Sequence, residues 1–321
     1  MAHSSVRTRP RLGLGCASLG SPDLHDRDAE AVIAAAIERG IRFFDVAPLY
    51  GGGVAEERLG RALAGRPRND YVLSTKTGVT RAYATTALPA GATRRRELDR
   101  WDYGAQATRA SVMTSLARLR VERLDVVHLH DVEDHVQACL EAHAELARLR
   151  EQGVVGAIGI GSNLAAPVRT LIDRAPFTTF LLAGCYTLLD QSGAALLDTA
   201  TQRRMHAVIG GVFNSGVLAQ WPNPAPSFGY LPADADIRAR TARIAAICAR
   251  YDVPLGAAAL QFAASHPAVE TVLIGPRTVE ELDTNLALYA HAIPAPLWDA
   301  LAQADVVPAE RAAAAQEAFA A

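Results

Sequence analysis

The stretch YVLSTK at residues 71–76 is a short apolar run of the kind that forms a buried strand, and it ends on a lysine. Seven similar runs occur along the chain, with amphipathic stretches of helical period between them. This alternation predicts βα units and a parallel sheet. The eight expected strands are RLGLGC (11–16), RFFDV (42–46), YVLSTK (71–76), DVVHLH (125–130), VVGAIGI (154–160), FLLAGC (180–185), AVIGGV (207–212) and ETVLIG (270–275).

The connecting segments favour a closed α/β barrel. Helical patterns cover residues 28–40, 55–65, 106–120 and 135–153, and several end in the glycine that terminates a helix. Eight strands with intervening helices describe a (β/α)8 TIM barrel better than an open doubly wound sheet. The 321 residues fit one barrel plus loops, so we expect a single domain over residues 1–321.

Two connections are too long to be plain turns, namely residues 79–104 after the third strand and 213–236 after the seventh. Both follow the carboxyl ends of strands, where barrel enzymes build their sites. The C-terminal segment RAAAAQEAFAA (311–321) is expected to be either a docked helix or a frayed one. The stretch GLGCAS (13–18) begins like a dinucleotide-binding glycine loop, but its third glycine is missing and no helix follows at once, so a Rossmann fold is excluded.

Composition indicates a protein that acts on small molecules. The formal net charge is −2 and arginine is scattered, which argues against a nucleic-acid or anionic-membrane partner. The N-terminus MAHSSVRTRPR lacks a signal-peptide core, and no stretch approaches the ~20 apolar residues of a membrane span. We therefore expect a cytoplasmic protein of unspecified oligomeric state. The four cysteines lack the spacing of metal ligands, so we expect no metal and expect their thiols to be reduced and to serve in packing. These residues are Cys16, Cys139, Cys185 and Cys248.

Four chemically active side chains follow consecutive expected strands. Among the 32 Lys and Arg residues only Lys76 is a lysine, and an ammonium, unlike a guanidinium, is compact and shifts its pKa when buried. Asp45 and Tyr50 follow the second strand, and His130 ends the fourth. An ammonium stabilises a tyrosine phenolate, an aspartate holds the lysine charged, and a histidine hydrogen-bonds a reacting oxygen. Together they predict a proton-transfer site for a carbonyl or alcohol.

The segments FFDVAPLYG (43–51), VLSTKTG (72–78), LDVVHLH (124–130) and IGIGSN (158–163) resemble the aldo-keto reductase family in order and spacing, and the resemblance covers nearly the whole chain. It implies that Tyr50 is the general acid/base, that Lys76 and Asp45 tune it, and that His130 contacts the substrate oxygen. His130, rather than His128, takes the family position. A nicotinamide cofactor is implied across the barrel mouth.

The resemblance also implies a set of cofactor-binding residues. Ser162 and Asn163 match the pair that holds the nicotinamide carboxamide. VFNSGVL (212–218) is similar to the pyrophosphate loop and IGPRTVEELDTN (274–285) to the adenosine segment. The implied contacts in these two segments are Phe213, Asn214, Gly216, Leu218, Gly275, Arg277, Thr278, Glu281 and Asn285. Because Glu281 would repel a 2′-phosphate, we expect NAD, while Arg277 leaves NADP open.

Two positions depart from the common family pattern. Ala183 replaces an amide-binding glutamine, and Gly210 replaces an aromatic residue that stacks on the nicotinamide. We expect Phe213 to substitute in part for the missing aromatic residue. The packing around the nicotinamide ring is therefore expected to differ from that of many members.

Four further segments resemble the aldose 1-dehydrogenase branch of the family, which includes L-fucose, D-threo-aldose and pyridoxal dehydrogenases. These segments are RLGLGCASLG (11–20), WDYG (101–104), HLHDVE (128–133) and CYTLLDQSG (185–193). The resemblance implies oxidation of an aldose at C1 to a lactone. The aromatic residues Trp101, Tyr103 and Trp221 are expected to stack on the sugar, and Asp131 to accept a hydroxyl hydrogen bond. Oxidation of pyridoxal and NADPH-dependent aldehyde reduction are the alternatives within the family.

Other classes remain open at this point. A Schiff-base aldolase would use Lys76 as the nucleophile. A metal-dependent hydrolase would use His128, His130, Asp131 and His135 as ligands, but further ligands on other strands are missing except for Asp45. A regulatory subunit would bind the cofactor without turnover, although the four complete site residues argue against it.

Overall fold

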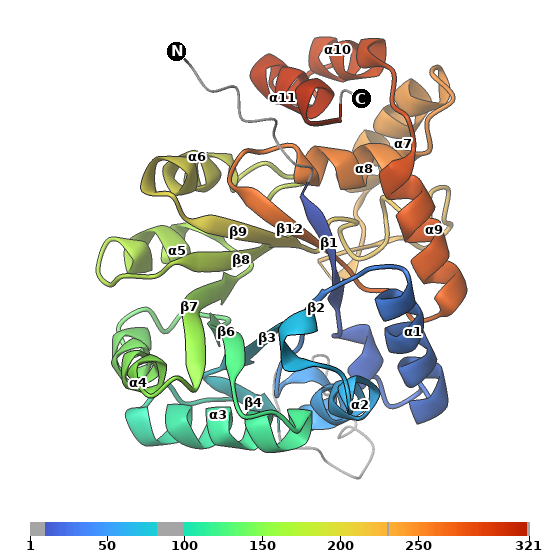
Figure 1. Ribbon diagram of the computed structural model, residues 1–321. Helices are drawn as coiled ribbons and strands as arrows, with labels where there is room; N and C mark the ends of the chain where they lie inside the picture. The colour runs from blue at the N-terminus through green and yellow to red at the C-terminus, as the bar shows by residue number, and fades with distance from the viewer. Residues whose placement is uncertain (1–9, 82–98, 230, 320–321) are drawn as a thin grey trace, which may run out of the picture. The chain divides into compact units, whose positions relative to one another are not determined.

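The structure is a computed structural model that describes residues 10–81, 99–229 and 231–319 (Figure 1). Eight strands form a closed parallel barrel in the order β1, β12, β9, β8, β7, β6, β3, β2, which confirms the predicted (β/α)8 fold. Each expected strand is present, with ends shifted by at most a few residues. The barrel strands are β1 (Arg11–Gly15), β2 (Phe43–Asp45), β3 (Val72–Thr77), β6 (Leu124–His130), β7 (Val155–Ser162), β8 (Thr179–Ala183), β9 (His206–Gly210) and β12 (Val269–Ile274).

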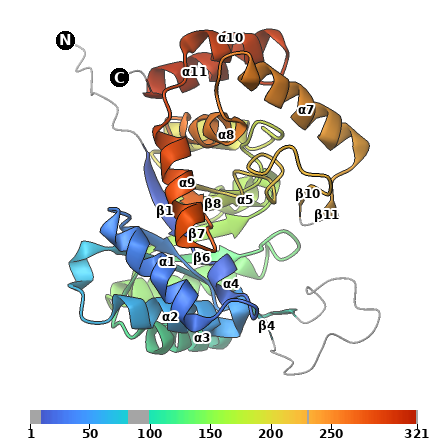
Figure 2. The ribbon, with the colours of Figure 1, turned by 90° about the vertical axis from the view of Figure 1, so that its right-hand side faces the viewer.

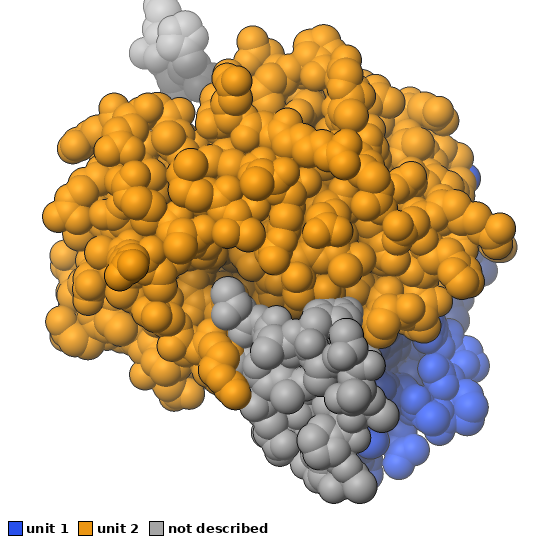
Figure 3. Space-filling view, turned by 90° about the horizontal axis from the view of Figure 1, so that it is seen from below, with its two compact units in different colours: residues 1–12, 182–273, 283–321 blue, residues 13–181, 274–282 orange. Residues whose placement is uncertain are grey.

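The chain divides into two compact units, each held together by its own internal contacts and coloured separately in Figure 3. The unit of residues 13–181 and 274–282 holds the first half of the βα succession. In it α4 packs on β6 and β7, and α3 packs on β3. Its helices are α1 (Asp26–Glu38), α2 (Val54–Leu63), α3 (Ala105–Leu119), α4 (Cys139–Glu151) and α5 (Ala165–Ile172), with 3-10 turns η1 (Ser18–Gly20), η2 (Tyr50–Gly53) and η3 (Arg68–Asp70).

The other unit comprises residues 1–12, 182–273 and 283–321. The helix α8 is buried along almost its whole length, because its small alanines allow close packing on every side. In Figure 2, α10 and α11 lie against each other, and α11 also contacts α8. The helices of this unit are α6 (Ala194–Arg203), α7 (Ala235–Ala249), α8 (Leu255–Ala264), α10 (Ala295–Gln303) and α11 (Ala309–Phe319). The helix α9 (Val279–Ala290) has its first turn in the unit of residues 13–181 and 274–282 and the rest in this one. That the whole chain is one domain stays a prediction.

The two long connections contain short antiparallel ribbons that sequence reasoning did not predict. After β3, the strand β4 (Val79–Arg81) pairs with β5 (Asp99–Trp101), and residues 82–98 lie outside the described part. In the second connection, β10 (Ser227–Phe228) pairs with β11 (Leu231–Pro232). Strands of two or three residues are too short for an alternating pattern to show. Within the three described ranges, no helix is both long and apolar enough to cross a bilayer.

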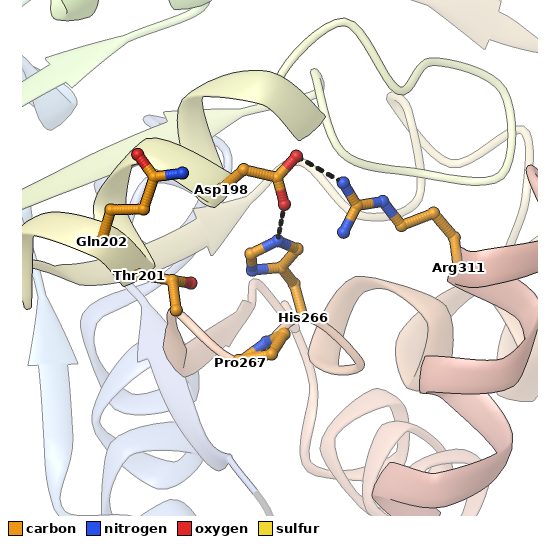
Figure 4. A pocket seen from close by; sticks show the side chains of 6 residues that line it. All are labelled: Asp198, Thr201, Gln202, His266, Pro267 and Arg311. Carbon is orange, nitrogen blue, oxygen red and sulfur yellow. Dashed lines mark hydrogen bonds and ion pairs between the residues drawn. The ribbon is translucent and has the colours of Figure 1, made fainter.

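The C-terminal helix α11 is docked rather than frayed over its described residues. Arg311 at its start donates to Asp198 of α6 at 2.6 Å, and the same carboxylate lies 3.1 Å from Nε2 of His266 (Figure 4). The His266 side chain is only 1% exposed, and its Nδ1 accepts the amide of Ala268, so Nε2 is the donor to Asp198. A hollow of about 420 Å³ lies beside these groups, and its charges already satisfy one another.

We predict that Asp198→Ala lowers the free energy of unfolding by about 1–3 kcal/mol, because a buried imidazole and a guanidinium both lose their acceptor. Urea unfolding followed by circular dichroism measures this. Asp236→Ala is the matched control, since its carboxylate is 75% exposed and 3.8 Å from Arg240; it should cost about 0.5 kcal/mol or less. Equal losses for the two variants would contradict a specific anchoring role for Asp198.

Candidate active site

The four residues predicted to act together all belong to the unit of residues 13–181 and 274–282. Asp45 is the last residue of β2, Lys76 lies near the end of β3, and His130 is the last residue of β6. Tyr50 begins the turn η2 that follows β2. The β2–β3 and β3–β6 pairs are parallel, so these residues gather at the carboxyl ends of neighbouring strands.

Lys76 and Asp45 form a buried ion pair. Nζ of Lys76 donates to Oδ2 of Asp45 at 2.5 Å and to the backbone oxygen of Val46 at 3.0 Å. The two side chains are 1% and 3% exposed. Burial alone would lower the pKa of Lys76, but the charge of Asp45 and the hydrogen-bonded Tyr50 raise it overall. The lysine is therefore held as an ammonium at neutral pH.

Tyr50 lies against this ammonium. Nζ of Lys76 is 4.8 Å from the centre of the Tyr50 ring, and the ring of His130 meets it edge-on with centroids 5.8 Å apart. A close approach between two backbones fixes the tyrosine: a Cβ on Gly20 would lie 2.5 Å from the carbonyl carbon of Tyr50. Gly51 next to it adopts φ +66°, which favours glycine. The phenol is thus seated between a cation and an imidazole.

His130 is supported from behind by Tyr103. The Tyr103 hydroxyl donates to the backbone oxygen of His130 at 2.5 Å, and the side chain is buried. Its ring fills the space above Gly78, where a Cβ would lie 2.2 Å from the ring. Tyr103 was expected to stack on a substrate. That role stays a prediction; in the structure the buried Tyr103 holds the backbone of His130.

Trp101 lies on the β4–β5 ribbon next to the site. It packs with Tyr50 against a buried cluster that contains Leu49 and Val79. Its ring stacks on His135, with centroids 5.7 Å apart and an interplanar angle of 26°. His135 was considered only as a metal ligand in the sequence. In the structure its imidazole fixes the Trp101 ring by stacking on it.

Glu133 organises the pair that matches the carboxamide site, and sequence reasoning missed it. Its Oε1 accepts from Oγ of Ser162 at 3.0 Å and from the amide of Asn163 at 2.7 Å. The Asn163 side-chain amide lies 3.3 Å from both Glu133 and Asp131. Asp131 has φ +52° and lies 3.9 Å from Nε2 of His130. The sequence signal was the acidic run after His130.

Two carboxylates surround the one arginine of the segment expected to hold adenosine, and only one of them belongs to that segment. The Arg277 guanidinium donates to Asp23 at 2.7 Å, and its backbone amide donates to Glu281 at 2.7 Å. Hydrogen bonds from Ser21 and from Arg277 lower the pKa of Asp23 to about 2. The Thr278 hydroxyl accepts the amide of Glu281. Asp23 was not anticipated, because it lies far from Arg277 in sequence.

Ser18 is a further residue that the sequence did not single out. Its Oγ lies 3.2 Å from the backbone oxygens of both Gly275 and Pro276, and its single proton is donated to this pair. A Cβ on Gly275 would lie 3.6 Å from the carbonyl oxygen of Gly15. Ser18 therefore holds the start of the segment expected to bind adenosine.

The remaining expected cofactor residues belong to the other unit. At the turn 213–218, the amides of Gly216 and Leu218 donate to the carbonyl of Phe213 at 3.0 and 3.2 Å. The amide of Asn214 donates to the carbonyl of Gly211, just before the turn, at 2.9 Å. Gly216 adopts φ +98°. These three amides are hydrogen-bonded within the protein, and a pyrophosphate cradle at this turn stays a prediction. Asn285 and the proposed substrate residue Trp221 also belong to this unit, and their roles stay predictions.

The geometry separates the alternative chemistries. A Schiff base requires a neutral, accessible amine, whereas Lys76 is 1% exposed, ion-paired and has a raised pKa. Among the described residues, no three His, Cys, Asp or Glu side chains are grouped so as to hold a metal ion. A tyrosine hydroxyl beside a fixed ammonium, with an imidazole at its edge, is suited to passing a proton to or from an oxygen.

A tyrosine, a lysine–aspartate pair and a histidine thus lie together at the carboxyl-terminal strand ends of a parallel barrel. The model of the aldo/keto reductase family matches residues 11–305. The chain belongs to this family, whose members use NAD(P)(H).

Two curated relatives are similar over most of their length. A D-threo-aldose 1-dehydrogenase of a Pseudomonas species is 38% identical, covering 93% of this chain and 95% of the relative. A pyridoxal 4-dehydrogenase of Microbacterium luteolum is 36% identical, with 90% and 92% covered.

Solved structures share the fold. A glycerol dehydrogenase from Gluconobacter oxydans gives a TM-score of 0.74 at 22% identity, with 96% of this chain and 98% of that chain covered. An aldo-keto reductase from Bacillus halodurans, in its holo form, gives 0.72 at 23% identity, with 97% and 95% covered.

Proposed function

We propose that this protein oxidises an aldose at C1 to the lactone, with NAD as the hydride acceptor, in the cytoplasm. The observation that carries the proposal is the buried Lys76–Asp45 pair directly beside the Tyr50 ring. The aldose class follows the relative at 38% identity, and L-fucose or a D-threo-aldose is the expected substrate. Pyridoxal is the second candidate, favoured by the relative at 36% identity.

The chain's own residues account for the proton. Tyr50, as a phenolate stabilised by the Lys76 ammonium, removes the proton of the anomeric hydroxyl, while the C1–H bond breaks and the C1–O double bond forms. His130 hydrogen-bonds the same oxygen and fixes its position. When bound, NAD supplies the acceptor for the hydride that leaves C1. Since the base must be deprotonated, oxidation should quicken as pH rises through the pKa of Tyr50.

Ser162 and Asn163 fit a nicotinamide carboxamide, because together they offer a hydroxyl and an amide with both donors and acceptors. Glu133 holds both of them, so they are oriented by the protein. Trp101, steadied by His135, is proposed to cover the apolar face of the sugar, and Asp131 to accept one of its hydroxyls.

NAD is proposed over NADP because the one arginine of the adenosine segment is already occupied. Asp23 pairs with the guanidinium of Arg277, and Glu281 adds a second carboxylate close by. A 2′-phosphate would meet both negative charges. It would also have to displace Asp23 before Arg277 became available.

We therefore predict that Asp23→Asn lowers the NAD-over-NADP preference in kcat/KM by about tenfold, since one charge-assisted pair to the guanidinium is lost. Steady-state rates with each cofactor at a fixed aldose concentration measure it. Asp26→Asn, which alters another carboxylate paired with arginines in the same unit, is the control and should leave the preference unchanged. An unchanged ratio in Asp23→Asn would contradict the proposal for cofactor choice.

The test of the proposed function is formation of reduced nicotinamide by the purified protein with NAD and, separately, NADP. L-Fucose, D-arabinose, other aldoses and pyridoxal are the substrates to compare. Turnover of an aldose with NAD supports the proposal. Turnover of pyridoxal alone, or of an aldehyde with NADPH only in the reducing direction, would replace it with the corresponding alternative.

A further inference from the structure

We propose that Ser74 and His128 are positioning residues, which form a one-way hydrogen-bond chain that holds the Asp45 carboxylate anchoring Lys76. This inference rests on the proposed function, because it assigns the hydrogen-bond chain a part in the proton transfer by Tyr50. Both side chains are fully buried, so neither is expected to touch a substrate. Both act through Asp45.

The chain begins at the carboxylate. Oγ of Ser74 donates to Oδ1 of Asp45 at 2.9 Å, while Lys76 takes the other oxygen, Oδ2, at 2.5 Å. Ser74 and Asp45 are register partners across the β2–β3 pair. With a donor on each oxygen, the carboxylate cannot rotate without breaking one of two buried hydrogen bonds. The direction in which Asp45 presents its charge to Lys76 is therefore fixed.

The hydrogen-bond directions follow from counting protons. A serine hydroxyl has one proton, and Ser74 gives it to Asp45, so Nδ1 of His128, 3.2 Å from Oγ, must be the donor to Ser74. His128 is then a neutral imidazole protonated at Nδ1. Burial, followed by the charges of Lys76 and His130, lowers the pKa of His128 and agrees with this state.

A histidine at position 128 costs stability unless its Nδ1–H group makes a hydrogen bond. The side chain is fully buried, and among the described residues its Nε2 has no hydrogen-bond partner, which costs folding free energy. Strand β7 has a glycine opposite it: a Cβ on Gly159 would lie 2.4 Å from Cδ2 of His128. An apolar residue at position 128 would pack there without a buried polar atom. The Nδ1 hydrogen bond is what the imidazole adds.

The hydrogen-bond chain formed by His128, Ser74 and Asp45 affects Tyr50 through charge. Donation from Ser74 draws the negative charge of Asp45 away from Lys76, so more of the ammonium's field reaches the Tyr50 phenolate. The other titratable groups near the pair are His130 on β6 and Cys16 just after β1; burial raises the pKa of the Cys16 thiol, which stays neutral. Loss of this hydrogen-bond chain should therefore make the Tyr50 hydroxyl a weaker acid, with a higher pKa.

The experiment compares Ser74→Ala, His128→Leu and His128→Asn. Leucine fills the space but has no donor, whereas the asparagine side-chain amide places a donor near the former Nδ1. Ser265→Ala is the control, because it removes the same atom from another buried serine, whose hydroxyl donates to Phe262. For each variant, kcat and KM for aldose oxidation are measured across the pH range.

We expect Ser74→Ala and His128→Leu to lower kcat about three- to thirtyfold with little change in KM, as fits a lost hydrogen bond to a charged group. The rising limb of their kcat–pH profile should move to higher pH. His128→Asn and Ser265→Ala should resemble the wild type. A His128→Asn variant as impaired as His128→Leu, or loss of kcat with an unmoved limb, would overturn the proposal in favour of packing alone.

A substrate-free measurement separates this inference from the proposed function. Ultraviolet difference titration, with the Tyr50→Phe curve subtracted, follows ionisation of Tyr50 directly. A midpoint at higher pH in Ser74→Ala supports the chain even if no aldose is turned over, in which case only the proposed function fails. An unshifted midpoint in Ser74→Ala refutes the chain whatever the substrate.

Discussion

Replacing Tyr50 with phenylalanine is expected to lower kcat for aldose oxidation by about 10²–10⁴-fold, the usual contribution of a positioned general acid or base. The reason is local. The hydroxyl of Tyr50 is the group that takes the substrate proton, while the Lys76 ammonium, which stabilises its phenolate, remains in place. Because the aromatic ring remains, its edge contact with His130 should also persist.

The measurement combines steady-state rates with cofactor affinity by fluorescence titration. Affinity should be nearly unchanged, because Tyr50 is proposed to meet the substrate oxygen rather than the cofactor. Tyr71→Phe provides a matched control: it removes the same atom from a buried tyrosine of the same unit, packed edge-on against Phe44. Activity of Tyr50→Phe within tenfold of the wild type would remove Tyr50 from the mechanism.

The barrel could be predicted because its strands are buried apolar runs that differ clearly from the amphipathic helices between them. The ends of the runs 71–76 and 125–130 differ from those of the observed β3 and β6 by at most one residue. The β4–β5 and β10–β11 ribbons could not be predicted, because strands of two or three residues are fixed by tertiary contacts rather than by a pattern. The docking of α11 depended equally on a distant partner, Asp198.

The central site residues could be placed because parallel strands end on one side of a barrel, so Asp45, Lys76 and His130 had to converge. Partners that depend on loop paths, such as Asp23 for Arg277, gave no sequence signal. Ser74 is an intermediate case. It lies two residues before Lys76 on the same strand, and alternate residues of a strand share a face.

The same alternation applies on β6, where His128 precedes His130 by two residues. A polar residue two positions before an active one, on adjacent strands, indicates an inward-facing polar pair. Its partner could not be read from the sequence, because the β2–β3 register determines that Ser74 meets Asp45.

Replacing Lys76 with arginine is the second change with a large expected effect, although it conserves the charge. The ammonium fits a fully enclosed space, donating to Asp45 and to the backbone oxygen of Val46. A planar guanidinium is larger, with five donors in a rigid fork. It would either push Asp45 and Tyr50 apart or leave buried donors unsatisfied, and over-packing a core costs about 1–3 kcal/mol.

We therefore expect Lys76→Arg to lose at least about 10²-fold in kcat, because its charge no longer lies where it stabilises the Tyr50 phenolate. It should also unfold at a lower urea concentration. Lys76→Met distinguishes charge from shape: it fits the space but leaves Asp45 as an uncompensated buried charge, which costs about 3–5 kcal/mol at neutral pH.

The pH dependence of stability supplies a check that needs no substrate. Since the pKa of Lys76 is raised in the folded protein, the ion pair contributes fully below the pKa of an unfolded lysine, about 10.4, and its contribution is lost as pH rises through the folded value. The difference in unfolding free energy between the wild type and Lys76→Met should therefore be constant around neutrality and shrink only in strongly alkaline solution. If this difference in unfolding free energy already disappears near neutral pH, Lys76 is not held as an ammonium. That result would favour Lys76 as the nucleophile of a Schiff-base aldolase.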